Sequence, residues 1–213
     1  MKKQSGFTLI ELAIVLVIIG LLLGGVLKGQ ELINSAKVKN LVADFKNVPV
    51  YIYGYQDKFK ALPGDDDAAK THLGASATNS SGPTLGYIDG KWDSETATED
   101  SVLFWEHVRL AGLAPGPTSV GTDVAAFVPK NSNGGRVGVS SVPPISGMTG
   151  SYFVCSSGID AKFALQMDIT MDNGNTTTGS VRATSNPSTA TSAPSAEAIT
   201  AATTGIYTVC QSF

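Results

Sequence analysis

The sequence predicts an α+β protein in which a long N-terminal α-helix packs on a C-terminal globular head with a small antiparallel sheet and short helices. Residues 7–27 are apolar except for one ionisable side chain, and apolar positions then recur every three or four residues as far as Phe59. Residues 60–213 alternate short apolar segments with turn residues, and their number suits one head of ordinary size.

The first segments read as a basic leader at residues 1–6 and a membrane-spanning helix at 7–27. A helix of about 20 residues crosses the roughly 30 Å of a bilayer's hydrocarbon core. Lys2 and Lys3 favour a cytoplasmic N-terminus. Glu11 is the single charge in the apolar run, and a carboxylate at the centre of such a helix costs roughly 2.5–3.5 kcal/mol, less near an end. The carboxylate therefore marks a candidate functional site that needs a partner.

The junction between these segments reads Gly6-Phe7-Thr8-Leu9-Ile10-Glu11-Leu12. This run resembles the N-terminal signature of the type IV pilins and the pseudopilins of type II secretion, which join a short basic leader to a long apolar helix. The resemblance implies that a membrane-embedded prepilin peptidase cleaves between Gly6 and Phe7 on the cytoplasmic side. It also implies N-methylation of the new amine on Phe7, and Glu11 then becomes the fifth residue of the mature chain.

Cleavage would give Glu11 a partner. The new amine on Phe7 is a positive charge at a lipid-buried helix end, and a carboxylate one turn further on neutralises it, in cis or from a neighbouring subunit. A secretory signal peptide fits less well, because Lys28-Gly29-Gln30 follows the apolar run where an Ala-x-Ala cleavage site would be expected. A plain membrane anchor would not explain the Gly-Phe junction together with the acid.

Residues 28–59 form the expected amphipathic half of the helix, which packs on the head. Pro49 is expected to bend this helix or to remove one of its hydrogen bonds. The stripe of apolar side chains comprises Leu32, Ile33, Ala36, Leu41, Val42, Phe45, Val48, Ile52, Tyr55 and Phe59.

The head spans residues 60–213, and its elements follow from turn residues and periodicity. Residues 160–171 alternate like a strand, yet the cap, the helix formers and a terminal Asp-Asn-Gly favour a helix. Trp105 is expected in the core. Short helices are predicted at 68–73, 99–113 and 160–171. Strands are predicted at 134–140, 152–155 and 206–210, and loops at 79–90 and 175–204.

Cys155 and Cys210 are the only cysteines, and in an oxidising periplasm they are expected to form one disulfide that closes the C-terminal region of the head. Two buried free thiols are the alternative. The bridge would tie the C-terminal segment to the rest of the head.

Calcium is a second possible feature of the head, since loop carboxylates are the hard oxygen ligands that this ion prefers. The candidates are Asp65, Asp67, Asp89 and Asp93. Resemblance to pseudopilins, whose heads sometimes use calcium, supports the idea. The EF-hand spacing is absent, and acids at helix starts or in solvated loops explain the same residues.

Other classes of function find little support. The formal charge is −3, and loss of Lys2 and Lys3 with the leader makes it −5, so nucleic acid is not an expected partner. His72 and His107 have no further His or Cys at zinc spacing, which favours a surface or capping role. No nucleophile-elbow motif and no complete phosphate loop occurs, so we expect no enzyme activity and no cofactor.

The sequence therefore predicts a structural subunit, a pilin or pseudopilin that polymerises through its N-terminal helix into a type IV pilus-like or type II secretion filament. The alternative is a minor pilin at a filament tip that binds a surface, a substrate or DNA. The resemblance implies an inner-membrane location with a periplasmic head before assembly into a filament. It also implies other subunits, an assembly platform and a separate cytoplasmic ATPase as partners.

Overall fold

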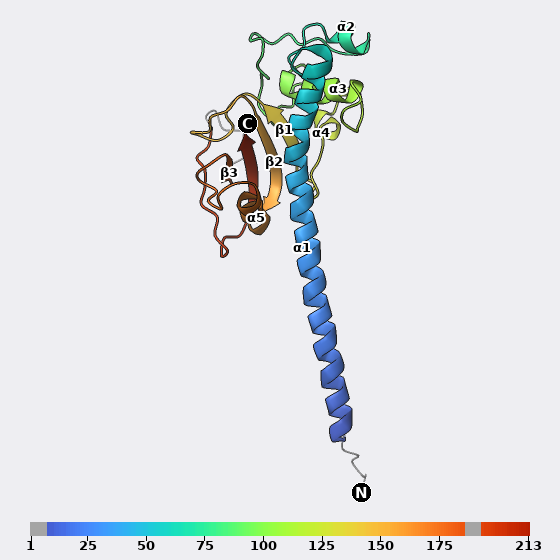
Figure 1. Ribbon diagram of the computed structural model, residues 1–213, viewed down its shortest axis with the longest axis vertical. Helices are drawn as coiled ribbons and strands as arrows, with labels where there is room; N and C mark the ends of the chain where they lie inside the picture. Colours follow the sequence, from blue (N-terminus) through green and yellow to red (C-terminus); the bar gives the residue numbers. More distant parts are fainter. Residues whose placement is uncertain (1–7, 186–192) are drawn as a thin grey trace. The chain divides into compact units, whose positions relative to one another are not determined.

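The computed structural model describes residues 8–185 and 193–213, and it confirms the α+β fold (Figure 1). The chain divides into two compact units, Met1–Lys37 and Val38–Phe213, and the first helix runs from one into the other. The order of elements is α1 (Leu9–Phe59), α2 (Ala69–Leu73), α3 (Asp100–Leu110), α4 (Val124–Phe127), β1 (Val137–Ser140), β2 (Phe153–Asp160), α5 (Ala161–Met171), β3 (Val181–Thr184) and β4 (Ile206–Ser212).

The part of α1 in the first unit exposes its apolar side chains. Leu9, Leu21 and Leu27 are examples, with 89%, 73% and 67% of their surface accessible. Among the described residues, α1 is the one helix that is long and apolar enough to cross a membrane by length and composition. Such a surface is stable only when lipid or other apolar helices cover it.

The part of α1 in the second unit buries one face in the core of the head. Its buried residues are Val38, Leu41, Val42, Phe45, Val48, Ile52 and Tyr55. Leu32, Ile33 and Ala36, which the periodicity placed in the same stripe, are exposed, so packing within one chain begins at Val38. The helix continues through Pro49 without interruption. It ends at Phe59, where Lys60 adopts a left-handed φ of 56°.

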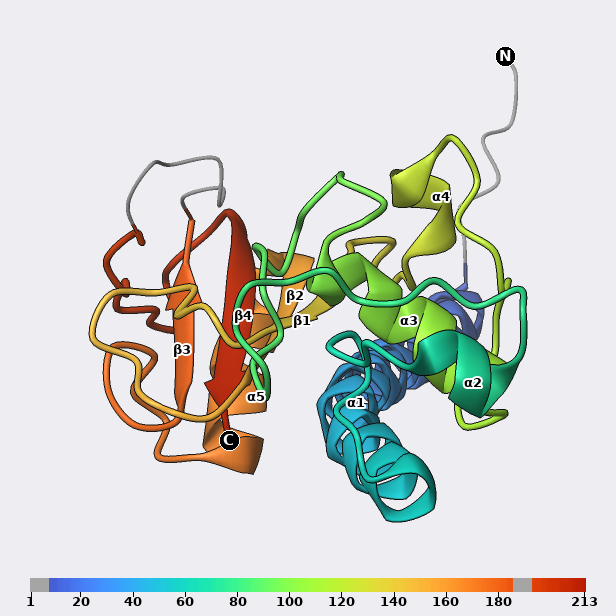
Figure 2. The ribbon, with the colours of Figure 1, turned by 90° about the horizontal axis from the view of Figure 1, so that it is seen from above.

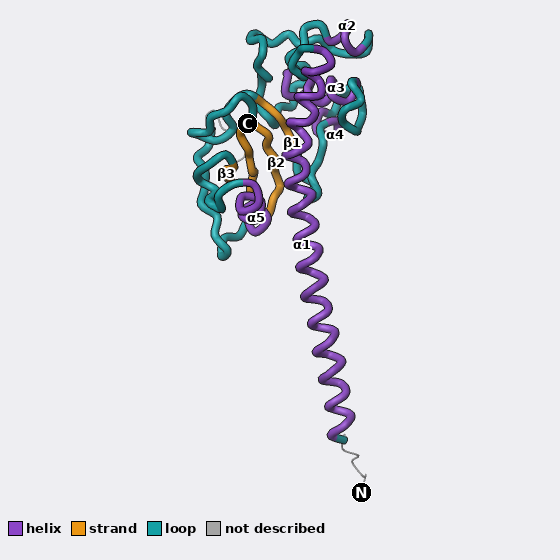
Figure 3. Tube along the Cα trace, in the orientation of Figure 1, coloured by secondary structure: helices purple, strands orange, loops and turns teal. Residues whose placement is uncertain are grey.

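The four strands of the described residues form one antiparallel sheet in the order β1-β2-β4-β3 (Figure 3). The long strand β2 lies between β1 and β4, and Cys155 of β2 stands opposite Cys210 of β4. The register between these two strands shifts between Ser156 and Ile159. Gly158 lies in this shift with a φ of +72°, which glycine adopts without strain.

Helices cover the sheet and the second half of α1. α5 packs against β2, β3 and β4, and α3 packs against β1. Seen from above, α3 runs beside α1 (Figure 2). Asp100 to Arg109 of α3 are buried, and the main core cluster joins apolar side chains of α1 and α3 to those of the sheet. Trp105, 4% exposed, belongs to this core as the sequence predicted.

Most expected elements are confirmed, and the exceptions are short. Residues 160–171 are helical as α5, which decides between the two readings of their pattern. The loop prediction for 175–204 was wrong at β3, which pairs with β4, and residues 186–192 lie outside the described part. β2 extends to Asp160, beyond the predicted end at residue 155. The helix α4 was not predicted; the Asp123 side chain caps it by accepting a hydrogen bond from the Ala126 N–H at 3.1 Å.

The predicted disulfide is confirmed. Cys155 and Cys210 are bonded, with Cα atoms 4.1 Å apart, and neither has exposed surface. The bond therefore joins the neighbouring strands β2 and β4 at directly opposed positions, inside a small cluster with Trp92, Ile145, Met148 and Phe153.

Candidate functional site

The first described residues form a reciprocal cap at the start of α1. The Thr8 N–H and the Thr8 hydroxyl donate to Glu11 Oε2 at 2.7 and 2.8 Å. In return, the Glu11 N–H donates to Thr8 Oγ1 at 3.3 Å. This is a capping box, which satisfies backbone donors that a helix start leaves free. Glu11 therefore acts within its own chain, in addition to any role between subunits.

The sequence reasoning missed the role of Thr8, although its signal is present. A threonine three residues before a glutamate at the start of an apolar run is the pattern of a capping box. Both hydrogen bonds reach one oxygen of the Glu11 carboxylate, and a carboxylate has about four acceptor positions. The cap is thus compatible with a cation bound to the same group. Gly6 and Phe7, the predicted processing residues, lie outside the described residues.

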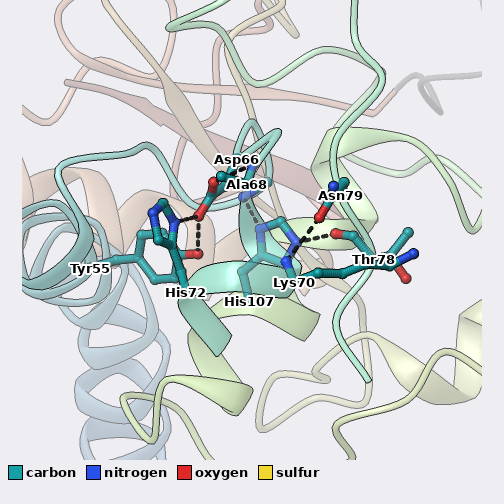
Figure 4. Close-up of polar contacts among 9 residues, drawn as sticks. Tyr55, Asp66, Ala68, Lys70, His72, Thr78, Asn79 and His107 are labelled. Atoms are coloured by element: carbon teal, nitrogen blue, oxygen red, sulfur yellow. Dashed lines mark hydrogen bonds and ion pairs between the residues drawn. The ribbon is translucent and has the colours of Figure 1, made fainter. Parts of the chain in front are cut away.

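In the head, a buried polar network lies where α1 ends (Figure 4). The Tyr55 hydroxyl donates to Asp66 Oδ2 at 2.6 Å, and His72 Nδ1 lies 2.7 Å from the same oxygen. The Ala68 N–H donates to Asp66 Oδ1 at 2.9 Å. Burial acts to raise the pKa of Asp66, but these hydrogen bonds outweigh it and the pKa is lowered. The network ties the turn after α1 to the helix itself.

His107 forms a second part of this network from α3. Its ring is fully buried, so the surface part of the predicted surface or capping role was wrong for this histidine. The Gly64 N–H donates to Nδ1 at 3.0 Å, and Nε2 lies 2.7 Å from the Thr78 carbonyl oxygen. These partners require the neutral ring with its proton on Nε2. Burial is the main cause that lowers the pKa of His107.

We expect His107 to make the head sensitive to acid. Since its pKa is lower in the folded than in the unfolded chain, its contribution to stability is full above about pH 6.5 and is lost as the pH falls. His107→Phe should cost about 1–3 kcal/mol for each of the two backbone groups left without a partner. Denaturant unfolding in detergent, from pH 7.5 to 5, measures both effects.

The comparison is cleanest in a His72→Gln background, because the chain has two histidines and His107 is then the one that remains. Other titrating groups, such as Asp44, are common to both proteins and cancel in the comparison. The gap in unfolding free energy between this background and its His107→Phe derivative should narrow below pH 6.5. A gap that stays constant across the range would contradict the assignment of a neutral, buried ring.

The four predicted calcium ligands do not share one surrounding. Asp65 is buried beside Asp89 and Asp100, whereas Asp67 is exposed. Burial first, and then the charges of Asp89 and Asp67, raise the pKa of Asp65. Asp93 instead acts on Arg136: burial lowers the pKa of that guanidinium, and the charge of Asp93 opposes this effect.

Hydrogen bonds to the carboxylates of Asp65 and Asp100 hold the loop that precedes α3. The Asp65 carboxylate accepts from the N–H groups of Gly86 and Tyr87, and Asp100 accepts from the Ser80 hydroxyl at 2.7 Å. Within residues 8–185 and 193–213, no group of three or more His, Cys, Asp or Glu is arranged to hold a metal ion. Calcium binding stays a prediction, which calorimetric titration of the chain would test.

The comparisons with known proteins bear on the N-terminal segment. Residues 1–27 match the family model of the prokaryotic N-terminal methylation motif, which is the signature of type IV pilins and pseudopilins. Comparison with curated proteins and with solved structures finds no further match. The signature supports a pilin-like or pseudopilin subunit, a structural class without enzymatic turnover. Together with the single apolar helix, it fits a membrane-anchored pilin processed by a prepilin peptidase.

Proposed function

We propose that the chain is a structural subunit, a pilin or pseudopilin, that polymerises through its N-terminal helix into a type IV pilus-like or type II secretion filament. The observation that carries this proposal is the exposed apolar surface of α1 immediately after the methylation motif. The most apolar stretch of this helix has no residue buried in the chain itself. Lipid covers such a surface before assembly, and neighbouring helices cover it afterwards.

Glu11 would set the position of each subunit in the filament. After cleavage, the N-methylated amine of Phe7 is a cation at the start of α1, and the Glu11 carboxylate of a neighbouring subunit neutralises it. Burial of either charge alone is costly, and their pairing offsets much of that cost. The capping box supports this role, because it fixes the carboxylate at the helix start with acceptor positions to spare.

The expected partners follow from this function. A prepilin peptidase removes residues 1–6, and an inner-membrane platform with a separate cytoplasmic ATPase drives assembly. The chain starts as a single-pass inner-membrane protein with a cytoplasmic N-terminus and a periplasmic head. It then becomes part of a periplasmic or cell-surface filament.

Replacement of Gly6 by Leu is expected to leave the leader attached. Glycine has no side chain, so the peptide bond to Phe7 can approach a buried protease site closely, and leucine would prevent this. Mass spectrometry of the membrane-bound chain measures the cleaved fraction and the methyl group on Phe7. The control is Gly20→Leu, which adds the same side chain where nothing lies within 4 Å of the new Cβ. Equal cleavage of wild type and Gly6→Leu would contradict the assigned site.

The filament itself is tested by shearing it from cells that express the chain with its assembly machinery. The processed chain should appear in the sheared fraction. A dominant share would identify a major subunit, and a trace would favour the minor or tip subunit. A chain that is cleaved and methylated but never enters any filament would contradict the proposed function.

A further inference from the structure

The head contains a cavity beside the second half of α1. Its volume is about 250 Å³, and it lies between α1, α3, the loop after α3 and the segment that leads into β1. A cavity of about 150 Å³ accepts benzene, and pockets for drug-sized ligands start near 300 Å³. The space therefore suits one long side chain or a molecule of that size.

One wall of the cavity carries three oxygen-bearing side chains from a single face of α1. Asp44, Asn47 and Tyr51 are spaced three and four residues apart, which places them one above the other on a helix. The charge of Asp44 acts to raise the pKa of Tyr51, after the larger effect of burial, as expected for two side chains on the same face of α1. Together they offer a carboxylate, an amide oxygen and a hydroxyl as hydrogen-bond acceptors.

Among the described residues, no charged side chain forms an ion pair with the Asp44 carboxylate. It makes no hydrogen bond or salt bridge with any residue in 8–185 or 193–213. Burial alone raises its pKa to about 6. Lys130 also lines the cavity, but it is exposed and forms no ion pair with Asp44. A half-buried carboxylate of this kind attracts a cation from outside the chain.

The remaining walls are apolar, aromatic and held in place. Trp105, Ala114, Pro115 and Val137 line the space, and an aromatic ring favours an organic cation over an inorganic one. Buried Arg109 fixes the loop that supplies Pro115, because its Nε donates to the Pro115 carbonyl at 3.1 Å. Its Nη1 donates to the carbonyls of Pro117 and Phe127 at 3.1 and 2.8 Å. The cavity is thus formed before any ligand arrives.

We propose that this cavity binds the side chain of a lysine from a polypeptide partner, with the ammonium group against Asp44, Asn47 and Tyr51 and the aliphatic stem against the apolar walls. An ammonium group has three N–H donors, which matches the three acceptors on α1. The four-carbon stem of lysine packs well on apolar surface while its charge is held at one end. The site is independent of the filament contacts of the N-terminal helix.

The test uses the full chain in detergent, labelled with 5-fluorotryptophan and titrated with Nα-acetyl-lysine methylamide. Fluorine NMR reports Trp105 at the cavity, and Trp92, which packs in the separate disulfide cluster, is the internal control. The Trp105 signal should shift saturably, with a Kd on the order of 1 mM, the strength of a single small contact. Nα-acetyl-norleucine methylamide has the same stem without the ammonium and should bind about tenfold more weakly, a difference of 1.4 kcal/mol.

Two further arms isolate the carboxylate. Asp44→Asn should weaken lysine binding about tenfold, whereas Asp57→Asn, at an exposed aspartate on the same helix, should leave it unchanged. In the wild type, binding should weaken from pH 8 to pH 5, because Asp44 is protonated below about pH 6 while the lysine stays charged. Equal binding of the norleucine probe, no saturable shift at Trp105, or undiminished binding to Asp44→Asn would each overturn the proposal.

Discussion

Glu11→Gln is expected to be cleaved and inserted into the membrane normally, yet to enter filaments about a hundredfold less than the wild type. Glutamine at this position preserves the capping box, since its side-chain oxygen accepts from the Thr8 N–H as glutamate does. It removes only the charge that would neutralise the Phe7 amine of a neighbour. An unpaired charge inside a membrane-like core costs roughly 2.5–3.5 kcal/mol, which corresponds to about a hundredfold in incorporation.

Two more variants separate the cap from the charge. Thr8→Ala keeps the carboxylate but removes the hydroxyl of the cap, which is typically worth about 1 kcal/mol, so incorporation should fall only severalfold. Glu11→Ala loses both and should be the weakest of the three. Quantitative immunoblots of sheared filaments, normalised to the membrane-bound mature chain, measure the ratios.

The relative incorporation of these three variants into filaments decides the role of Glu11. If Glu11→Gln assembles like the wild type while Thr8→Ala fails, the carboxylate serves the helix start and not a contact between subunits. Expression of the variant together with the wild type adds a check, because the proposed contact needs the Glu11 carboxylate of one subunit and the Phe7 amine of its neighbour. A chain with Glu11→Gln should enter filaments better when wild-type subunits surround it than when it is expressed alone.

Removal of the disulfide is expected to give the largest loss of stability in the head. The bond closes a loop with a sequence separation of 55 residues, for which the chain-entropy model gives about 4 kcal/mol. With a slope of about 2 kcal/mol per molar urea, Cys155→Ala/Cys210→Ala should unfold at about 2 M less urea than the wild type. The measurement is tryptophan fluorescence of the full chain in detergent.

Reduction provides the matched control. Dithiothreitol should lower the unfolding midpoint of the wild type to that of the double variant, and it should not change the double variant itself. Both sulfur atoms are buried, so reduction should require unfolding and proceed slowly under native conditions. A double variant that unfolds at the wild-type urea concentration would show that pairing of β2 with β4 holds the C-terminal segment without the bond.

The helix α5 was predictable because its signals are local. For α5, Asp160 precedes the helix, Ala161 and Ala164 favour it, and Asp172-Asn173-Gly174 follow its end, so local preference decided against the alternating pattern. The strand β3 carries no comparable signal. Val181 and Ala183 are its apolar residues among many Ser and Thr, and β3 forms because β4 offers an unpaired edge. A pairing of this kind depends on residues far away in the chain.

The sequence alone was enough to identify the N-terminal segment, because its meaning lies in contiguous residues. A basic leader, the Gly6-Phe7 junction, one carboxylate and a run of apolar residues define the processing motif and the membrane helix without any tertiary contact. The same holds for the disulfide, since two cysteines in the oxidising compartment that the sequence predicts leave one pairing.

Tertiary structure alone decided which polar groups of the head work together. His107 meets Gly64 and Thr78 across 43 and 29 residues, and Asp44 faces a cavity whose other walls come from α3 and β1. Periodicity places Asp44 beside the buried stripe of α1, but it does not reveal that the carboxylate forms no ion pair within the described residues, although Lys130 lines the same cavity. Burial and charge compensation depend on every segment that packs around a group, so they are properties of the folded chain and not of a local pattern.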